Sequence, residues 1–186
     1  MGVPAGLLIG YFVGSAHLFD PEVPAPAAAP AAPIPGAGAQ LAAQQRVLNE
    51  EAALAQDPRN VPGWVALGND YFDLNLFQKA VDAYGKALSL APDQAGAPAV
   101  LTDQGVMYRK LGQFAQAISN FKKASKIDPK FGPSQYNLGI VYAQDKHDPK
   151  AALAAFNQAI QVAPGSPTAE QARKAMAEMQ AAGAKP

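Results

Sequence analysis

Few side chains in this sequence combine in a pattern that could do chemistry. There are two histidines: His17 stands in an apolar stretch, and His147 stands between Asp145 and Asp148. An imidazole beside two carboxylates could bind a metal ion, but a hydrophilic turn has the same composition, so we expect no metal site. Cysteine is absent, which excludes disulfides, thiolate zinc sites, iron–sulfur clusters and a cysteine nucleophile.

Other catalytic patterns are missing from the 186 residues as well. The sequence contains no glycine-rich phosphate loop, no nucleophile elbow and no zinc-binding histidine pair. The 15 basic and 15 acidic side chains balance, so no overall positive field would recruit nucleic acid. Charge is uneven locally, because residues 98–131 hold six basic and two acidic side chains, and residues 61–97 hold two basic and four acidic ones. We predict a protein that is not an enzyme and has no cofactor, nucleic-acid partner or small-molecule substrate.

The N-terminal segment is apolar, and residues 2–19 contain no Asp, Glu, Lys or Arg. In a helix this segment would extend roughly 27 Å, close to the thickness of the hydrocarbon core of a bilayer. We therefore predict a transmembrane helix over residues 1–19. A cleaved signal sequence that ends near the small residues 14–16 is the main alternative, and a buried soluble helix is another.

Gly6, Gly10 and Gly14 recur every four residues in this segment. Small residues at this spacing let the backbone of a second membrane helix approach closely, so they are candidate packing positions for a partner. A glycine-rich composition alone would give the same spacing, and this alternative stays open.

Residues 20–40 form a predicted linker that is rich in proline and alanine. Six prolines occur there, and such a composition favours an extended chain that cannot bury a core. No Lys or Arg precedes Arg46, whereas Asp20 and Glu22 directly follow the apolar segment. Because positive charge marks the side that stays in the cytoplasm, we predict that the remainder of the chain is exported.

A repeat fills the rest of the sequence. Pro58, Pro92, Pro129 and Pro164 lie 34, 37 and 35 residues apart, and each follows an apolar-periodic segment that it would end as a helix. Each full unit carries a glycine and an aromatic residue in its first half and an alanine and an aromatic residue in its second half. These residues are Trp64, Leu67, Gly68, Tyr71, Ala80, Tyr84 and Ala87; then Leu101, Gly105, Tyr108, Ala117, Phe121 and Ala124; then Leu138, Gly139, Tyr142, Ala152, Phe156 and Ala159.

This pattern resembles the tetratricopeptide repeat, and departs from it by extra residues near 95–97 and 147–150 and by Gln104 where leucine is usual. The resemblance implies an all-α solenoid of three helix pairs over residues 61–97, 98–131 and 132–164, with the small residues at the helix crossings and the aromatic residues filling the space between. Residues 41–60 match only the second half of a repeat. Residues 165–186 have one apolar face, which is typical of a terminal capping helix.

The resemblance also implies that the first helix of each pair lines a concave groove that binds a peptide. The inward positions are Val65, Asn69, Phe72, Asp73, Thr102, Val106, Arg109, Tyr136, Asn137, Ile140 and Gln144. Each could instead be an ordinary solvated helix position. Some family members hold a carboxylate with lysine, asparagine and arginine at such positions, but here only Asn69 fits and Asp103 would repel the ligand.

Together these features predict a membrane-tethered tetratricopeptide scaffold that mediates protein–protein interaction. We expect it to be an accessory subunit or assembly factor of a membrane complex, in a bacterial inner membrane with a single pass and with the repeats in the periplasm. The alternative is an exported soluble adaptor or chaperone that binds client peptides, as relatives with this layout do in cytochrome c maturation and in pilus or secretin assembly.

Overall fold

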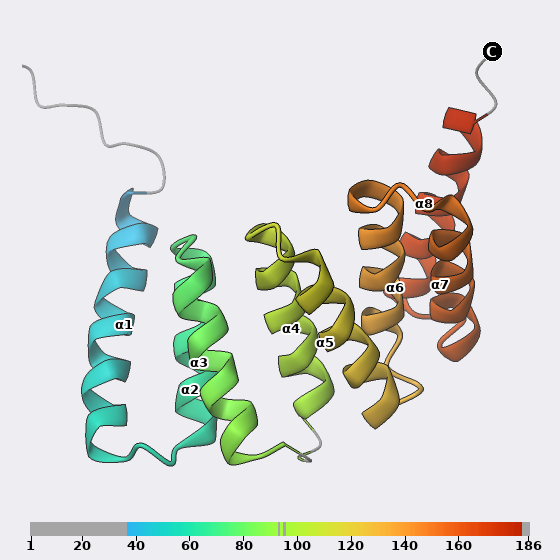
Figure 1. Cartoon of the computed structure of the whole chain (residues 1–186). Coiled ribbons are helices and arrows are strands. Elements are labelled where there is room, and N and C mark those ends of the chain that lie inside the picture. Colours follow the sequence, from blue (N-terminus) through green and yellow to red (C-terminus); the bar gives the residue numbers. More distant parts are fainter. Residues whose placement is uncertain (1–36, 93, 95, 184–186) are drawn as a thin grey trace, which may run out of the picture. The chain divides into compact units, whose positions relative to one another are not determined.

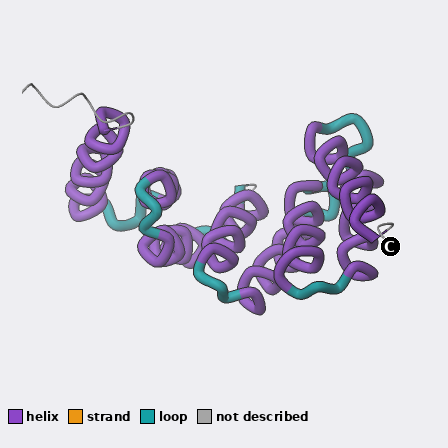
Figure 2. Tube along the Cα trace, turned by 90° about the horizontal axis from the view of Figure 1, so that it is seen from above, coloured by secondary structure: helices purple, strands orange, loops and turns teal. Residues whose placement is uncertain are grey.

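The computed structural model describes residues 37–92, 94 and 96–183, and these residues contain helices and loops but no strand (Figures 1 and 2). The helices are α1 (Ala37–Gln56), α2 (Val61–Asp73), α3 (Phe77–Leu90), α4 (Ala97–Lys110), α5 (Phe114–Ile127), α6 (Gly132–Ile140), α7 (Pro149–Val162) and α8 (Pro167–Gly183). A short π-helix, η1 (Val141–Asp145), continues α6. The predicted transmembrane helix and most of the predicted linker lie outside the described residues, and none of the described helices is long and apolar enough to span a bilayer.

The helices pack in pairs along the chain. Helix α2 packs against α3, α4 against α5, and α6 against α7, and each pair contacts the next one (Figure 1). Helix α1 packs on α2 at one end of the described stack, and α8 packs on α6 and α7 at the other. The predicted all-α solenoid of three helix pairs with flanking helices is therefore confirmed for the described part of the chain. Helix α1 begins at Ala37, which is earlier than the start expected from the sequence.

Side chains and prolines define where the helices begin. The side chain of Asn60 accepts a hydrogen bond from the backbone N–H of Gly63 at 3.0 Å, and Asp148 accepts one from Ala151 at 2.9 Å. Proline occupies the first turn of α2, α4, α6 and α7, where its missing N–H costs no helical hydrogen bond. Several prolines of the repeat region therefore start helices, and others follow their ends.

The glycines of the first helices are packing positions. A Cβ atom added to Gly68 would lie 2.5 Å from the ring of Tyr84, and one added to Gly105 would lie 2.5 Å from the ring of Phe121. Gly139 has the same relation to Phe156. Ala80, Ala117 and Ala152 on the second helices are fully buried, so the predicted packing of small residues against aromatic rings is confirmed.

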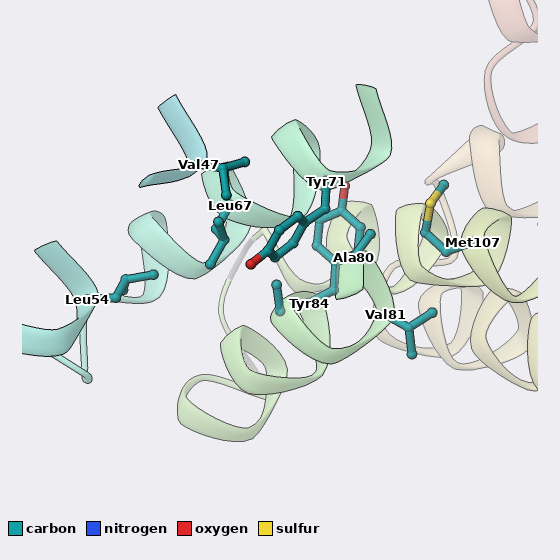
Figure 3. Close-up of a cluster of buried hydrophobic side chains, with 9 residues drawn as sticks. Val47, Leu54, Leu67, Tyr71, Ala80, Val81, Tyr84 and Met107 are labelled. Carbon is teal, nitrogen blue, oxygen red and sulfur yellow. The ribbon is translucent and has the colours of Figure 1, made fainter. Parts of the chain in front are cut away.

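Helix α1 completes the first of these cores. Figure 3 shows Val47 and Leu54 of α1 directed toward Leu67 and Tyr71 of α2. The sole tryptophan, Trp64, is partly buried against the same core, and its indole N–H donates to the carbonyl oxygen of Pro58 at 3.0 Å. These contacts explain how a half-repeat helix closes the end of the stack.

Candidate partner-binding face

The first helices of the three pairs form a common surface, which we call the groove face. Helices α4 and α6 contact each other, and α2 and α4 line one cavity together. Ten of the eleven residues predicted to line a groove are at least partly exposed, as a groove position requires: Val65, Asn69, Phe72, Asp73, Val106, Arg109, Tyr136, Asn137, Ile140 and Gln144.

Thr102 is the exception, and its prediction as a groove residue is wrong. The residue is only 4% exposed. Its hydroxyl donates a 2.8 Å hydrogen bond to the carbonyl oxygen of Pro98, one turn earlier in α4. Because this bond satisfies the hydroxyl within its own helix, the side chain can be buried as an apolar residue would be.

The end of α2 presents an aromatic residue and a carboxylate. Phe72 is 40% exposed, and its ring lies 6.4 Å from that of Phe77 at the start of α3. Asp73 lies 3.7 Å from Arg46 of α1, whose guanidinium also binds Asp70 through hydrogen bonds of 2.5 to 3.1 Å. Arg46 therefore ties α1 to α2, while Asp73 remains available to solvent.

Asn69 is oriented by a tyrosine from the second helix of its pair. The hydroxyl of Tyr84 donates to Oδ1 of Asn69 at 2.8 Å. Burial raises the pKa of Tyr84, and the nearby carboxylates of Asp103 and Asp73 raise it further, so this hydroxyl stays protonated and donates at neutral pH. Within the described residues the amide nitrogen of Asn69 has no acceptor, and it is free to donate to a partner.

Arg109 is occupied within the protein. Its guanidinium pairs with the carboxylate of Asp145, and it also donates to Oε1 of Gln144 at 2.8 Å. Both partners belong to η1, so this contact joins α4 to the end of the first helix of the third pair. Helical spacing predicts Arg109 and Gln144 on one surface, but it does not reveal Asp145, which stands out in the sequence only as a neighbour of His147.

A second cavity lies on this face near the C-terminal end of the described chain. It has a volume of about 470 Å³ and lies between α6, α7 and α8. Tyr136 and Ile140 line it, with the ring of Tyr136 5.8 Å from that of Phe156. Lys174 and Glu178 of α8 also line it, and they were not predicted because the apolar face of this helix indicates only a capping role.

His147 has a turn position in the structure. Its φ angle is 52°, in the left-handed region, and Asn75 and Gly112 adopt the same region in the corresponding turns of the first two pairs. Among the described residues no group of three or more potential metal ligands is present.

Comparison with known families and structures agrees with this geometry. A model described as "Tetratricopeptide repeat" matches residues 61–94, and one described as "TPR repeat" matches residues 105–146. The chain contains tetratricopeptide repeats. The resemblance seen in the sequence is confirmed at this level, and the repeats are an architecture that binds protein partners along an extended surface.

Individual relatives match only part of this chain. "Small glutamine-rich tetratricopeptide repeat-containing protein 2" of Mycosarcoma maydis is 31% identical over 102 residues, which are 54% of this chain and 28% of the relative. A co-chaperone of Aspergillus fumigatus, sgt12, is 31% identical over 94 residues, which are 50% of this chain and 26% of the relative. The chain thus spans about a quarter of the length of these two relatives. A crystal structure of MamA has a TM-score of 0.62 at 22% identity, covering 73% of this chain and 77% of that one, and it shares the fold.

Proposed function

We propose that this protein is a non-catalytic, membrane-tethered scaffold whose tetratricopeptide repeats bind another protein. The observation that carries the proposal is the groove face, where partly exposed apolar and aromatic side chains alternate with amides. Val65 and Phe72 on α2, Val106 on α4, and Tyr136 and Ile140 on α6 are its apolar residues.

Such a face suits a protein segment as its ligand. Apolar side chains of a partner would contact these residues, and Asn69 and Asn137 would offer amides to its backbone. The amide of Asn137 is only partly used, since its Nδ2 donates one hydrogen bond to the carbonyl oxygen of Pro133 at 2.9 Å.

The tether belongs to the proposal as well. The uncharged residues 1–19 and the proline-rich residues 20–40 support a single N-terminal membrane helix with a spacer that holds the repeats away from the bilayer. The absence of Lys and Arg before Arg46 supports an orientation in a bacterial inner membrane with the repeats in the periplasm. In this setting the protein would be an accessory subunit or an assembly factor of a membrane complex.

A second candidate function is an exported soluble adaptor or chaperone that binds client peptides. The similarity to a co-chaperone supports a transient client-binding role, and a cleaved N-terminal segment would release the protein from the membrane. N-terminal sequencing of the native protein separates the two candidates. An N-terminus at His17 or beyond supports the soluble form, whereas an intact N-terminus with residues 1–19 supports the tether.

Two sets of substitutions test where the partner binds. Gly6→Leu with Gly10→Leu places bulky side chains on the predicted small-residue surface and would keep a second helix from approaching closely. Loss of co-purification with a membrane complex would support a structural role for the membrane helix. Phe72→Ala with Tyr136→Glu alters the groove face and should abolish partner capture.

The matched control for the groove is Leu48→Ala with Ile127→Glu. These two residues are 59% and 43% exposed on α1 and α5, away from the groove face. Capture by the control and not by the groove variant supports the proposal. Equal capture by the groove variant and the unmodified protein would move the interaction away from this face and refute it.

A further inference from the structure

A cavity of about 430 Å³ opens between α2 and α4, next to the C-terminal end of α3. Its walls are mostly aliphatic and include Val61 and Val65 of α2, Leu88 of α3 and Val100 of α4. This volume lies within the range of pockets that bind a ligand group, and aliphatic walls favour an apolar occupant. The cavity belongs to the groove face because Val65 and Asn69 line it.

Asp103 is the only charged residue among the described residues that line this cavity. It forms no ion pair with any described residue, and the neighbouring basic residue of the face, Arg109, is paired with Asp145. The residue as a whole is exposed, but protein atoms crowd its carboxyl group and raise its pKa to about 6. A carboxylate held beside apolar walls without a counter-ion is a favourable partner for an incoming cation.

Two other polar residues, Asp73 and Asn69, lie at this end of the groove face. The charges of Asp103 and Asp73 both raise the pKa of the Tyr84 hydroxyl, and Asp73 is also paired with Arg46 of α1. Asn69, oriented by that hydroxyl, has an amide N–H that can donate to a backbone carbonyl. No Lys or Arg lies among the described residues that line the cavity. The site therefore combines an aliphatic pocket, the side-chain amide of Asn69 as a hydrogen-bond donor, and the negative charge of Asp103.

We propose that this pocket binds an aliphatic side chain of a partner protein segment, and that an adjacent lysine or arginine of the same segment pairs with Asp103. The inference rests on the proposed function, in which the groove face binds a protein, and it specifies the chemistry of the partner. A segment with acidic residues at this position is disfavoured because Asp103 repels it. The long stem of a lysine or arginine also suits the site, since its methylene groups can lie along the aliphatic wall while the charge reaches the carboxylate.

The test uses the full 186-residue chain in mild detergent against a random peptide library displayed on phage. Peptides that bind the unmodified protein should be enriched in lysine or arginine next to leucine, isoleucine or valine. Asp103→Asn should remove the basic preference, and Asp103→Lys should replace it with an acidic one. For one enriched synthetic peptide, calorimetry should show about fivefold to tenfold weaker binding to Asp103→Asn.

Asp82→Asn is the matched control. Asp82 lies on α3 of the first repeat and lines a different cavity, between α1, α2 and α3, so its loss should leave the peptide preference unchanged. Circular dichroism establishes that each variant is folded before binding is compared.

The two levels of the proposal fail in different ways. Enriched peptides without a basic preference, or a basic preference that survives Asp103→Asn, would overturn the assignment of this pocket while leaving protein binding by the groove face intact. A library that yields no binder would overturn the pocket assignment too. If partner capture also survives Phe72→Ala with Tyr136→Glu, the proposed function of the face fails with it.

Discussion

A buried pair of amides joins the first two repeats and gives the sharpest prediction about stability. Gln104 stands where the repeat usually has leucine, and it is 7% exposed. Its Nε2 donates to the carbonyl oxygen of Val81 at 2.9 Å, and its Oε1 accepts from Nδ2 of Asn120 at 2.7 Å. Asn120 is 6% exposed, so these hydrogen bonds connect α3, α4 and α5 out of contact with water.

Replacing Gln104 with leucine removes the acceptor of Asn120 and leaves its buried amide unsatisfied. A buried polar group without a partner costs about 1–3 kcal/mol. In an Asn120→Ala protein the same replacement leaves no amide without a partner. Gln104→Leu should therefore lower the free energy of unfolding by about 2 kcal/mol more when Asn120 is present than when it is absent. The control pair is Gln78 and Asp82, whose hydrogen bond of 3.0 Å is exposed. For Gln78→Leu with Asp82→Ala the coupling should be about 0.2–0.5 kcal/mol.

The double-mutant cycle is measured by urea unfolding at pH 7, followed by circular dichroism and by the fluorescence of Trp64. With a denaturant slope of about 2 kcal/mol per molar urea, a coupling of this size moves the midpoint by about 1 M. The two signals must coincide, because repeat arrays can unfold in parts. A coupling energy for Gln104 and Asn120 no larger than that of the exposed pair would refute the reasoning that this hydrogen bond is buried and satisfied.

Three further predictions concern a helix crossing, a turn and the groove face. Gly105→Ala should destabilise the protein by about 1–3 kcal/mol, because its Cβ would lie 2.5 Å from the ring of Phe121. Gly96 faces open space, so Gly96→Ala should destabilise the protein far less in the same urea titration. His147→Gly should raise the free energy of unfolding by about 0.5–1 kcal/mol, since His147 has a φ of 52° that glycine adopts without strain. A lower melting temperature of this variant would contradict the prediction. Asp103→Asn should stabilise the protein at pH 7.5 by less than about 1 kcal/mol and have no effect at pH 4. With its pKa raised to about 6, Asp103 keeps a proton in the folded state that it releases near pH 4 in the unfolded state. The free energy of unfolding therefore falls as pH rises from 4 to 6. An equal effect of Asp103→Asn at both pH values would exclude this cause.

The helix pairs and their crossings were predictable from the sequence because they depend on short, repeated spacings. A glycine and the aromatic residue that covers it are separated by 16 or 17 residues in each unit, as in Gly68 and Tyr84, Gly105 and Phe121, and Gly139 with Phe156. Each unit makes this contact independently, so the same spacing occurs three times and can be recognised in the sequence. A single unit would have given no such signal.

The chemistry of the groove face was predictable only in part. Helical spacing placed Thr102 and Arg109 on the same face, but spacing does not reveal whether a side chain has a partner elsewhere. Thr102 is buried because its hydroxyl binds within its own helix, and Arg109 is paired with a residue that lies 36 positions later. The cavity between α2 and α4 likewise depends on how two helices meet, which no local pattern encodes.

The extra residue of the third repeat explains how Arg109 acquires its partner. The glycine and the alanine that mark the two helices are 12 residues apart in the first two units and 13 apart in the third, from Gly139 to Ala152. The structure absorbs this residue at the end of the first helix as the π-helix η1, in which the backbone N–H of Lys146 donates to Val141 at 2.9 Å. A single-residue insertion of this kind rotates the side chains that follow it relative to the preceding helix.

This rotation has a consequence for the charge of the groove face. It directs Gln144 and Asp145 together toward Arg109, so the cation that α4 contributes near the middle of the face is neutralised by the third repeat. Asp103 on α4 has no ion pair with a described residue at the cavity between α2 and α4, whereas Asp73 on α2 pairs with Arg46 of α1. An insertion in one repeat thereby leaves negative charge dominant at the pocket of the repeats before it, which is the physical basis for expecting a basic partner there.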